Sequence, residues 1–179
     1  MNINGLLTGA LLPLVVLLAL SAFFSASETA ITASGRSKIL ALMERYPYQK
    51  RFFDWLLKDV QRVLTIALIS NNLVNVAASA VGTSLAIALL GQKGLLAAVV
   101  VMSVLIVIFG EVFPKCVAVV HPDSLMAFSL PLLRFLDILL APFLWLTLQI
   151  VRIMGLIFKV DLQSRHPFVT REEFEQMVT

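Results

Sequence analysis

The sequence has little charge and a single cysteine. Charged residues make up 14% of the 179 residues, whereas hydrophobic residues make up 59%. A typical soluble domain carries roughly a quarter charged residues and about half apolar ones. Charge is scarce, and the apolar residues are grouped in long runs. These two features exclude a soluble nucleotide-binding fold, a disordered tail and a nucleic-acid binder. The chain is therefore predicted to be an integral membrane protein.

Two further absences narrow this class. The lone Cys116 cannot form an internal disulfide or a thiolate metal cluster, which excludes a secreted disulfide scaffold. No Lys or Arg precedes Arg36, so the first apolar run lacks the basic region of a signal peptide. We expect that run to stay in the mature protein as a membrane span.

The apolar runs predict an all-α membrane protein with three transmembrane helices and amphipathic juxtamembrane belt helices. A span needs about 20 apolar residues to cross about 30 Å of hydrocarbon. Three runs meet this length within a transmembrane domain of residues 1–168, and they cover about residues 6–33, 63–90 and 95–115.

The segment 36–62 connects the first two spans and mixes seven basic and three acidic residues with aromatic and aliphatic ones. This mixture is typical of short helices lying at the membrane interface, with the Tyr46-Pro47 pair as a break. Because excess Lys and Arg mark cytoplasmic loops, we place this segment in the cytoplasm and the N-terminus outside. We expect a multi-pass protein of the cell (inner) membrane with a cytoplasmic C-terminus.

The segment 121–158 is open to two interpretations, another span or a belt at the interface. It is apolar, but Pro131, Arg134 and Asp137 interrupt it. Charged side chains tolerate an interface better than a bilayer core, so we favour the belt. The last segment, 169–179, has the pattern of a helix start, and we expect it to begin a cytoplasmic region that continues beyond this sequence.

Polar residues inside the predicted spans are costly and therefore informative. In the first span they recur at helical spacing and form one stripe, made of Ser21, Ser25, Glu28 and Thr32. In the second span they cluster at Ser70, Asn71, Asn72 and Asn75. Hydrogen bonding between helices is the alternative explanation for both groups.

The third span ends in a sequence whose proline is expected to disturb the helix, Gly110-Glu111-Val112-Phe113-Pro114-Lys115. Because proline has no N–H and displaces the carbonyl four residues earlier, Pro114 is expected to free the Gly110 carbonyl beside the Glu111 carboxylate. Unwound carbonyls and carboxylates bind cations in transporters. An ion pair between Glu111 and Lys115 is the simpler alternative.

The candidate ligands are all oxygen atoms, which favours a hard cation such as Mg²⁺ over a transition metal. The two histidines, His121 and His166, lie outside the spans. No residue spacing indicates a nucleophile with its base or a phosphate-binding loop. We expect a protein that is not an enzyme.

Three segments carry a family resemblance, and all three occur in order along most of the chain. They are Phe24-Ser25-Ala26-Ser27-Glu28-Thr29-Ala30, Ser70-Asn71-Asn72-Leu73-Val74-Asn75 and Gly110-Glu111-Val112-Phe113-Pro114-Lys115. They resemble the motifs of the CorC/cyclin M (CNNM) magnesium-transporter family. The resemblance implies a homodimer in the membrane that exports Mg²⁺ coupled to Na⁺ entry.

The resemblance also implies roles for single residues. The Mg²⁺ ligands would be the Ser25 and Ser70 hydroxyls, the Gly110 carbonyl and the Glu111 carboxylate. Next to them would come Asn71, Asn72 and Asn75, with Glu28 lining the cavity or a Na⁺ site. The resemblance implies that ATP acts only through a cytoplasmic CBS module, which we expect to be absent from this chain.

Two other functions compete with this prediction. The first is a membrane anchor and dimerisation scaffold that transports nothing and uses its polar residues to join helices. The second is a carrier for another divalent cation. We expect membrane lipids as binding partners and no nucleic acid, and the resemblance implies a second copy of the chain as a further partner.

Overall fold

Helices make up almost all of the described part of the protein. The computed structural model describes residues 3–158, and no strand occurs among them. These residues fall into two compact units, which are described separately below. The first unit comprises residues 3–33 and 67–129, and the second comprises residues 34–66 and 130–158.

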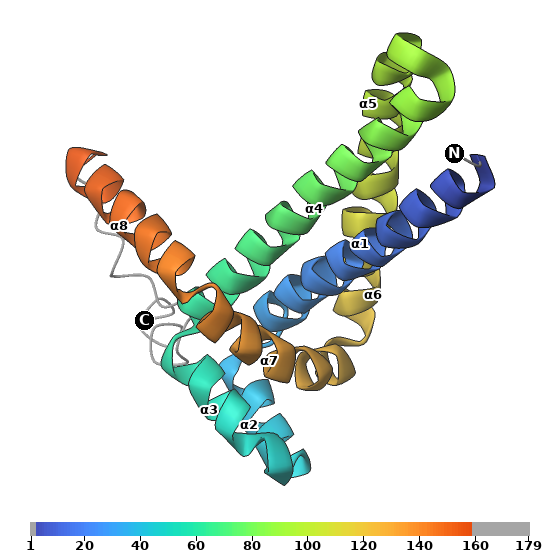
Figure 1. The fold of residues 1–179 in the computed structure, drawn as a ribbon. Helices are drawn as coiled ribbons and strands as arrows, with labels where there is room; N and C mark the ends of the chain where they lie inside the picture. The colour runs from blue at the N-terminus through green and yellow to red at the C-terminus, as the bar shows by residue number, and fades with distance from the viewer. Residues whose placement is uncertain (1–2, 159–179) are drawn as a thin grey trace, which may run out of the picture. The chain divides into compact units, whose positions relative to one another are not determined.

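The first unit contains the most apolar helices. Its elements are α1 (Ile3–Thr32), most of α4 (Val60–Leu90), η2 (Gly91–Lys93), α5 (Gly94–Leu105), η3 (Ile106–Val112), α6 (Phe113–Val120) and the start of α7 (Pro122–Leu139). The chain reverses direction between α4 and α5 (Figure 1). Gly91 has a φ of +65° at this reversal, a conformation that favours glycine.

Two apolar helical stretches in the described residues could cross a bilayer by length and composition. They are Gly9–Thr32 and Val60–Val120. The second stretch has 61 residues, which far exceeds the roughly 20 that one crossing needs, and its reversal at Gly91 gives two limbs. A pair of helices, Pro122–Leu139 and Ala141–Ile157, meets at 79° and is a further candidate as a broken span. The predicted all-α membrane class is confirmed.

Small residues let the helices of the first unit pack closely. A buried apolar cluster joins α1, α4, α5 and η3, and consists of Leu14, Ala78, Met102 and Ile106. Gly82 on α4 faces Met102 so closely that a Cβ at this position would overlap the methionine side chain. Close contact of this kind is how helices associate inside membranes, where lipid tails remove the hydrophobic driving force.

The second unit holds the amphipathic helices. It contains α2 (Arg36–Arg45), η1 (Pro47–Gln49), α3 (Lys50–Lys58), the first turns of α4, the end of α7 and α8 (Ala141–Phe158). α2 ends immediately before Tyr46-Pro47, the pair that marks a break in the sequence. α3 buries Phe53 and Leu56 completely while its lysines are exposed. The amphipathic helices predicted for residues 36–62 are therefore present.

Candidate metal centre

The polar stripe of α1 faces the irregular end of the third predicted span. Ser21 and Ser25 are fully buried on α1, which packs against η3 and α6. Residues four apart lie on the same face of a helix, so both hydroxyls point toward the same neighbours. The helical spacing that was visible in the sequence thus becomes a buried polar surface.

A widened helical turn supplies the opposite wall. Residues Ile106–Val112 form a π-helix, and the Phe113 N–H that follows it donates to the Ile108 carbonyl, five residues earlier. Pro114 comes next and has no N–H to donate. Wide turns of this kind are rare and are frequent at functional sites. Gly110 is buried within this turn.

The Ser21 hydroxyl lies at the centre of the polar cluster. Its Oγ is 3.0 Å from Asn71 Oδ1 and 3.4 Å from the Gly110 carbonyl oxygen. It is also within hydrogen-bond distance of Asn75 Oδ1. A hydroxyl has a single hydrogen, so it can donate to only one of these three acceptors at a time. At any time, two of these three acceptor oxygens therefore receive no hydrogen from Ser21.

Glu111 is held from two other helices. Its Oε1 accepts a hydrogen bond from Asn75 Nδ2 of α4 at 3.1 Å. Its main-chain carbonyl accepts one from Ser25 Oγ of α1 at 3.3 Å. No ion pair with Lys115 occurs among the described residues, and the Lys115 side chain is exposed. The simple ion pair that competed with a cation site is therefore absent from this structure.

The structure brings five of the eight predicted site residues into one hydrogen-bonded group around Ser21. These are Ser25, Asn71, Asn75, Gly110 and Glu111. They come from α1, α4 and η3, three elements that are far apart in the sequence. The structure thus places these five residues together, while their role as ligands stays a prediction.

The other three predicted residues lie outside the hydrogen-bonded group. Ser70 is 3% exposed, and its hydroxyl has no hydrogen-bond partner in the described residues. Asn72 is exposed, because it is rotated by about 100° around α4 from its buried neighbour Asn71. Glu28 is half-buried on the stripe of α1 and makes no side-chain hydrogen bond within residues 3–158.

Ser21 is the site residue that the sequence prediction left out. It belongs to the stripe that the spacing in the first span showed, but the candidate ligands from α1 were limited to Ser25 and Glu28. The structure shows why Ser21 is central: a Cβ added to Gly110 would lie 2.6 Å from Ser21 Oγ. The absence of a side chain at Gly110 is thus what admits the Ser21 hydroxyl.

The donor atoms of the cluster are of the kind that a hard cation prefers. It presents hydroxyl, amide and carbonyl oxygens together with one carboxylate. No group of three or more His, Cys, Asp and Glu side chains occurs in the part of the chain that the structure describes. Oxygen-only donors suit Mg²⁺ and Ca²⁺ rather than zinc or copper.

These features define a class, a helical membrane protein with an oxygen-rich cluster buried between its apolar helices. Comparison with known families then assigns the chain. The family model described as the cyclin M transmembrane N-terminal domain (CNNM) matches residues 12–179. The chain belongs to this family, as the three sequence motifs predicted.

Similar proteins occur in bacteria and plants. A UPF0053 protein of Haemophilus influenzae is 32% identical over 170 residues, which cover 93% of this chain and 40% of the relative. The UPF0053 inner membrane protein YfjD of Escherichia coli is 34% identical over 147 residues, which cover 80% of this chain and 34% of the relative. A chloroplastic DUF21 domain-containing protein of Arabidopsis thaliana is 37% identical over 169 residues, 92% of this chain and 25% of the relative. The chain thus spans a quarter to two fifths of the length of these relatives.

Proposed function

We propose that this protein is a carrier that exports Mg²⁺ across the cell membrane and couples the export to Na⁺ entry. The observation that supports this best is the excess of acceptor oxygens around Ser21 beside the Glu111 carboxylate. Lone pairs facing one another without protons repel, and a cation between them turns this repulsion into attraction. The cluster is therefore better suited to a cation than to structural hydrogen bonding alone.

The donor set fits a dehydrated Mg²⁺ ion. Mg²⁺ takes oxygen ligands in octahedral geometry and gives up water reluctantly, so a site must replace most of its water oxygens. The Gly110 carbonyl, the Ser25 hydroxyl and the Asn71 and Asn75 amide oxygens are neutral replacements. Glu111 would supply negative charge, which offsets the cost of placing a divalent ion among apolar helices.

The buried hydroxyl of Ser70 is a second observation that supports a bound cation. Its hydroxyl is buried on the inner face of α4, one residue before Asn71, and has no hydrogen-bond partner among residues 3–158. A buried polar group without a partner costs about 1–3 kcal/mol. A cation bound to Ser70 would offset this cost.

The remaining parts of the proposal rest on the family. Relatives of this chain include a protein named for the inner membrane. We infer a cell-membrane location, an outside N-terminus and a homodimer from the family resemblance and from the basic segment 36–62. Glu28, which has no side-chain partner in the described residues, is the candidate for the Na⁺ site.

The competing scaffold function also has support, because Ser21 and Asn75 hydrogen-bond across helices as interhelical contacts do. Thermal unfolding of the purified chain in rising Mg²⁺ separates the two functions. A protein that binds Mg²⁺ when folded gains about 2.7 kcal/mol at an ion concentration one hundred times the dissociation constant. A scaffold gains nothing.

Matched variants make the test specific. Glu111→Gln keeps the shape of the side chain and removes the charge, so the Mg²⁺-dependent stabilisation should be lost. Glu44→Gln removes one carboxylate from the exposed face of α2 and should keep the stabilisation. Equal stabilisation of both variants by Mg²⁺ would contradict the proposed site. Titration with Mn²⁺, Co²⁺ and Ca²⁺ in the same assay tests the alternative of another divalent cation.

A further inference from the structure

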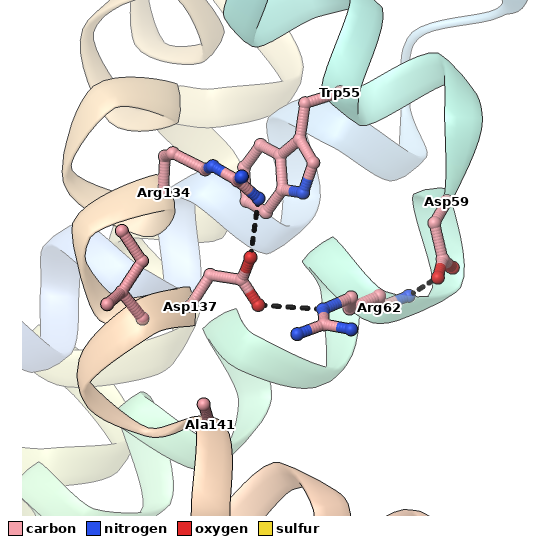
Figure 2. A pocket seen from close by; sticks show the side chains of 7 residues that line it. Trp55, Asp59, Arg62, Arg134, Asp137 and Ala141 are labelled. Carbon is pink, nitrogen blue, oxygen red and sulfur yellow. Dashed lines mark hydrogen bonds and ion pairs between the residues drawn. The ribbon is translucent and has the colours of Figure 1, made fainter.

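A second cluster of charged residues lies in the second unit, apart from the candidate metal centre. Asp137 on α7 is only 4% exposed, and it pairs with two arginines. Its Oδ1 is 2.7 Å from Arg62 Nε, and its Oδ2 is 2.6 Å from Arg134 Nη1 (Figure 2). Both carboxylate oxygens are therefore occupied, each by one arginine.

The arginines keep most of their hydrogen-bond donors. A guanidinium carries five N–H groups, and each arginine donates a single one to Asp137. No other hydrogen bond or ion pair of either guanidinium occurs within residues 3–158, and the two side chains are 40% and 43% exposed. Two positive charges share one buried negative charge, so the pair retains both surplus charge and surplus donors.

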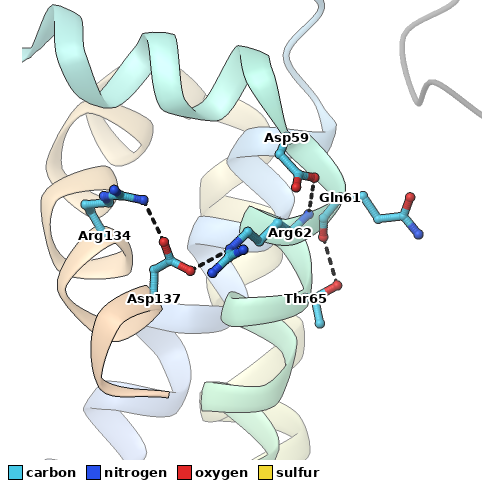
Figure 3. A network of polar contacts seen from close by, with 6 residues as sticks. All are labelled: Asp59, Gln61, Arg62, Thr65, Arg134 and Asp137. Carbon is cyan, nitrogen blue, oxygen red and sulfur yellow. Dashed lines mark hydrogen bonds and ion pairs between the residues drawn. The ribbon is translucent and has the colours of Figure 1, made fainter. Parts of the chain in front are cut away.

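Asp59 does not cancel this surplus. Its Oδ1 accepts a hydrogen bond from the main-chain N–H of Arg62 at 2.9 Å. The carboxylate therefore lies at the backbone end of Arg62, away from the guanidinium that reaches Asp137 (Figure 3). Asp59 is exposed, so water screens its charge.

The two guanidiniums line an open pocket of about 520 Å³. This volume falls within the roughly 300–1,000 Å³ of small-molecule sites. Trp55 forms one wall, with the Arg134 guanidinium 5.0 Å from the centre of its ring. Ile138 and Ala141 add apolar surface. The carboxylates of Asp59 and Asp137 line the pocket as well. The pocket thus combines the unused donors of two arginines with two carboxylates and an apolar part.

The residues around the pocket are of the kinds found at the boundary between lipid and water. Arg62 lies in the first turn of α4, immediately before the apolar part of that helix. Trp55 lies on α3, whose exposed face carries Lys50, Arg51 and Lys58. Tryptophan and basic residues are both typical of the interface where lipid headgroups sit.

We propose that this pocket binds the phosphodiester headgroup of a membrane phospholipid. The free N–H groups of Arg62 and Arg134 hold the phosphate oxygens, because the planar fork of a guanidinium matches two oxygens of one phosphate. The glycerol and the first acyl carbons lie against Ile138 and Ala141. This proposal is independent of Mg²⁺ transport, since it uses none of the residues around Ser21.

Native mass spectrometry of the full chain in detergent tests the proposal. Phosphatidylglycerol and diacylglycerol with the same acyl chains are added separately, since they differ in the headgroup. We expect adducts with phosphatidylglycerol and none with diacylglycerol. The double variant Arg62→Lys with Arg134→Lys keeps the charges that pair with Asp137 and removes the forked donors, so lipid retention should fall about tenfold.

Lys58→Gln is the matched control, because it removes a positive charge from the exposed face of α3 outside the pocket. It should retain phosphatidylglycerol as the unchanged protein does. Circular dichroism of the lysine variant checks that its helices persist. Equal retention of diacylglycerol, or full retention by the lysine variant, would overturn the proposal. Stabilisation by inorganic phosphate without retention of phosphatidylglycerol would assign the pocket to free phosphate and overturn the lipid ligand.

Discussion

The contact between Gly110 and Ser21 gives the sharpest test of the geometry described above. In Gly110→Ala the new Cβ would lie 2.6 Å from Ser21 Oγ and 3.3 Å from Ser21 Cβ. Ordinary contacts begin near 3.4 Å, so the Cβ and the hydroxyl oxygen must separate by about 0.8 Å. Ser21 is fully buried and its hydroxyl contacts Asn71 and Asn75, so rotation of the side chain would break these contacts. Overpacking of this kind costs about 1–3 kcal/mol.

Gly9→Ala is the reference for this measurement. It lies on the apolar helix α1, and a Cβ at Gly9 meets nothing within 4 Å. Both substitutions gain about 0.5–1 kcal/mol of helix propensity, so their difference isolates the overpacking. Denaturant unfolding in detergent, followed by circular dichroism, should show Gly110→Ala to be less stable than Gly9→Ala by about 1–3 kcal/mol.

A double variant identifies the atom that causes the loss of stability in Gly110→Ala. Ser21→Ala removes the Oγ that the new methyl group would strike, so it should relieve part of the loss in Gly110→Ala. We expect an interaction energy above about 0.5 kcal/mol between the two substitutions, beyond the error of additive sites. Equal stabilities of Gly110→Ala and Gly9→Ala, or additive effects in the double variant, would refute the close approach of α1 and η3.

Three further predictions concern single residues. Ser70→Ala should raise the unfolding free energy without Mg²⁺ by up to about 1–3 kcal/mol, because it removes a buried hydroxyl that has no partner in the described residues. The same substitution should weaken Mg²⁺ binding. A lower unfolding free energy without Mg²⁺ would contradict this prediction. Phe53→Ala should lower the unfolding free energy by about 3–5 kcal/mol in the same assay, since the ring is fully buried. A decrease below about 1 kcal/mol would show that Phe53 of α3 is not packed in this way. Asp137→Ala should lower the unfolding free energy by less than the roughly 3–5 kcal/mol lost when a fully buried ion pair is broken, because both arginines are half-exposed. An unchanged unfolding free energy would show that the two ion pairs do not form.

Local features of the fold could be predicted from the sequence. The Tyr46-Pro47 pair ends α2 because proline disfavours helix in the residue before it. The spacing of Ser21 and Ser25 placed their hydroxyls on one face of α1, and the structure buries both. These predictions succeed because they depend on neighbouring residues along one helix.

Features that depend on contacts between helices could not be predicted. Asn71 and Asn72 are adjacent and chemically identical, yet one is buried and the other exposed. Their difference comes from the rotation of α4 against its neighbours, which spacing alone does not define. The pairing of Arg62 with Asp137, 75 residues away, likewise has no local signal.

The π-helix over Ile106–Val112 falls between these two cases. Pro114 predicted a disturbed hydrogen-bond pattern near Gly110, because it lacks an N–H. It did not predict a widened turn of seven residues or the position of Ser21 against it. The central role of Ser21 emerges only when α1 is packed against this turn.

Mg²⁺ flux through the full chain in liposomes tests the central claim most directly. A fluorescent indicator trapped inside the vesicles reports Mg²⁺ entry under an imposed Mg²⁺ gradient, with Na⁺ on the opposite side. The proposed site predicts flux for the unchanged chain and for Glu44→Gln, and none for Glu111→Gln, which keeps the side chain's size but loses the charge. Flux through Glu111→Gln equal to that of the unchanged chain would contradict the account.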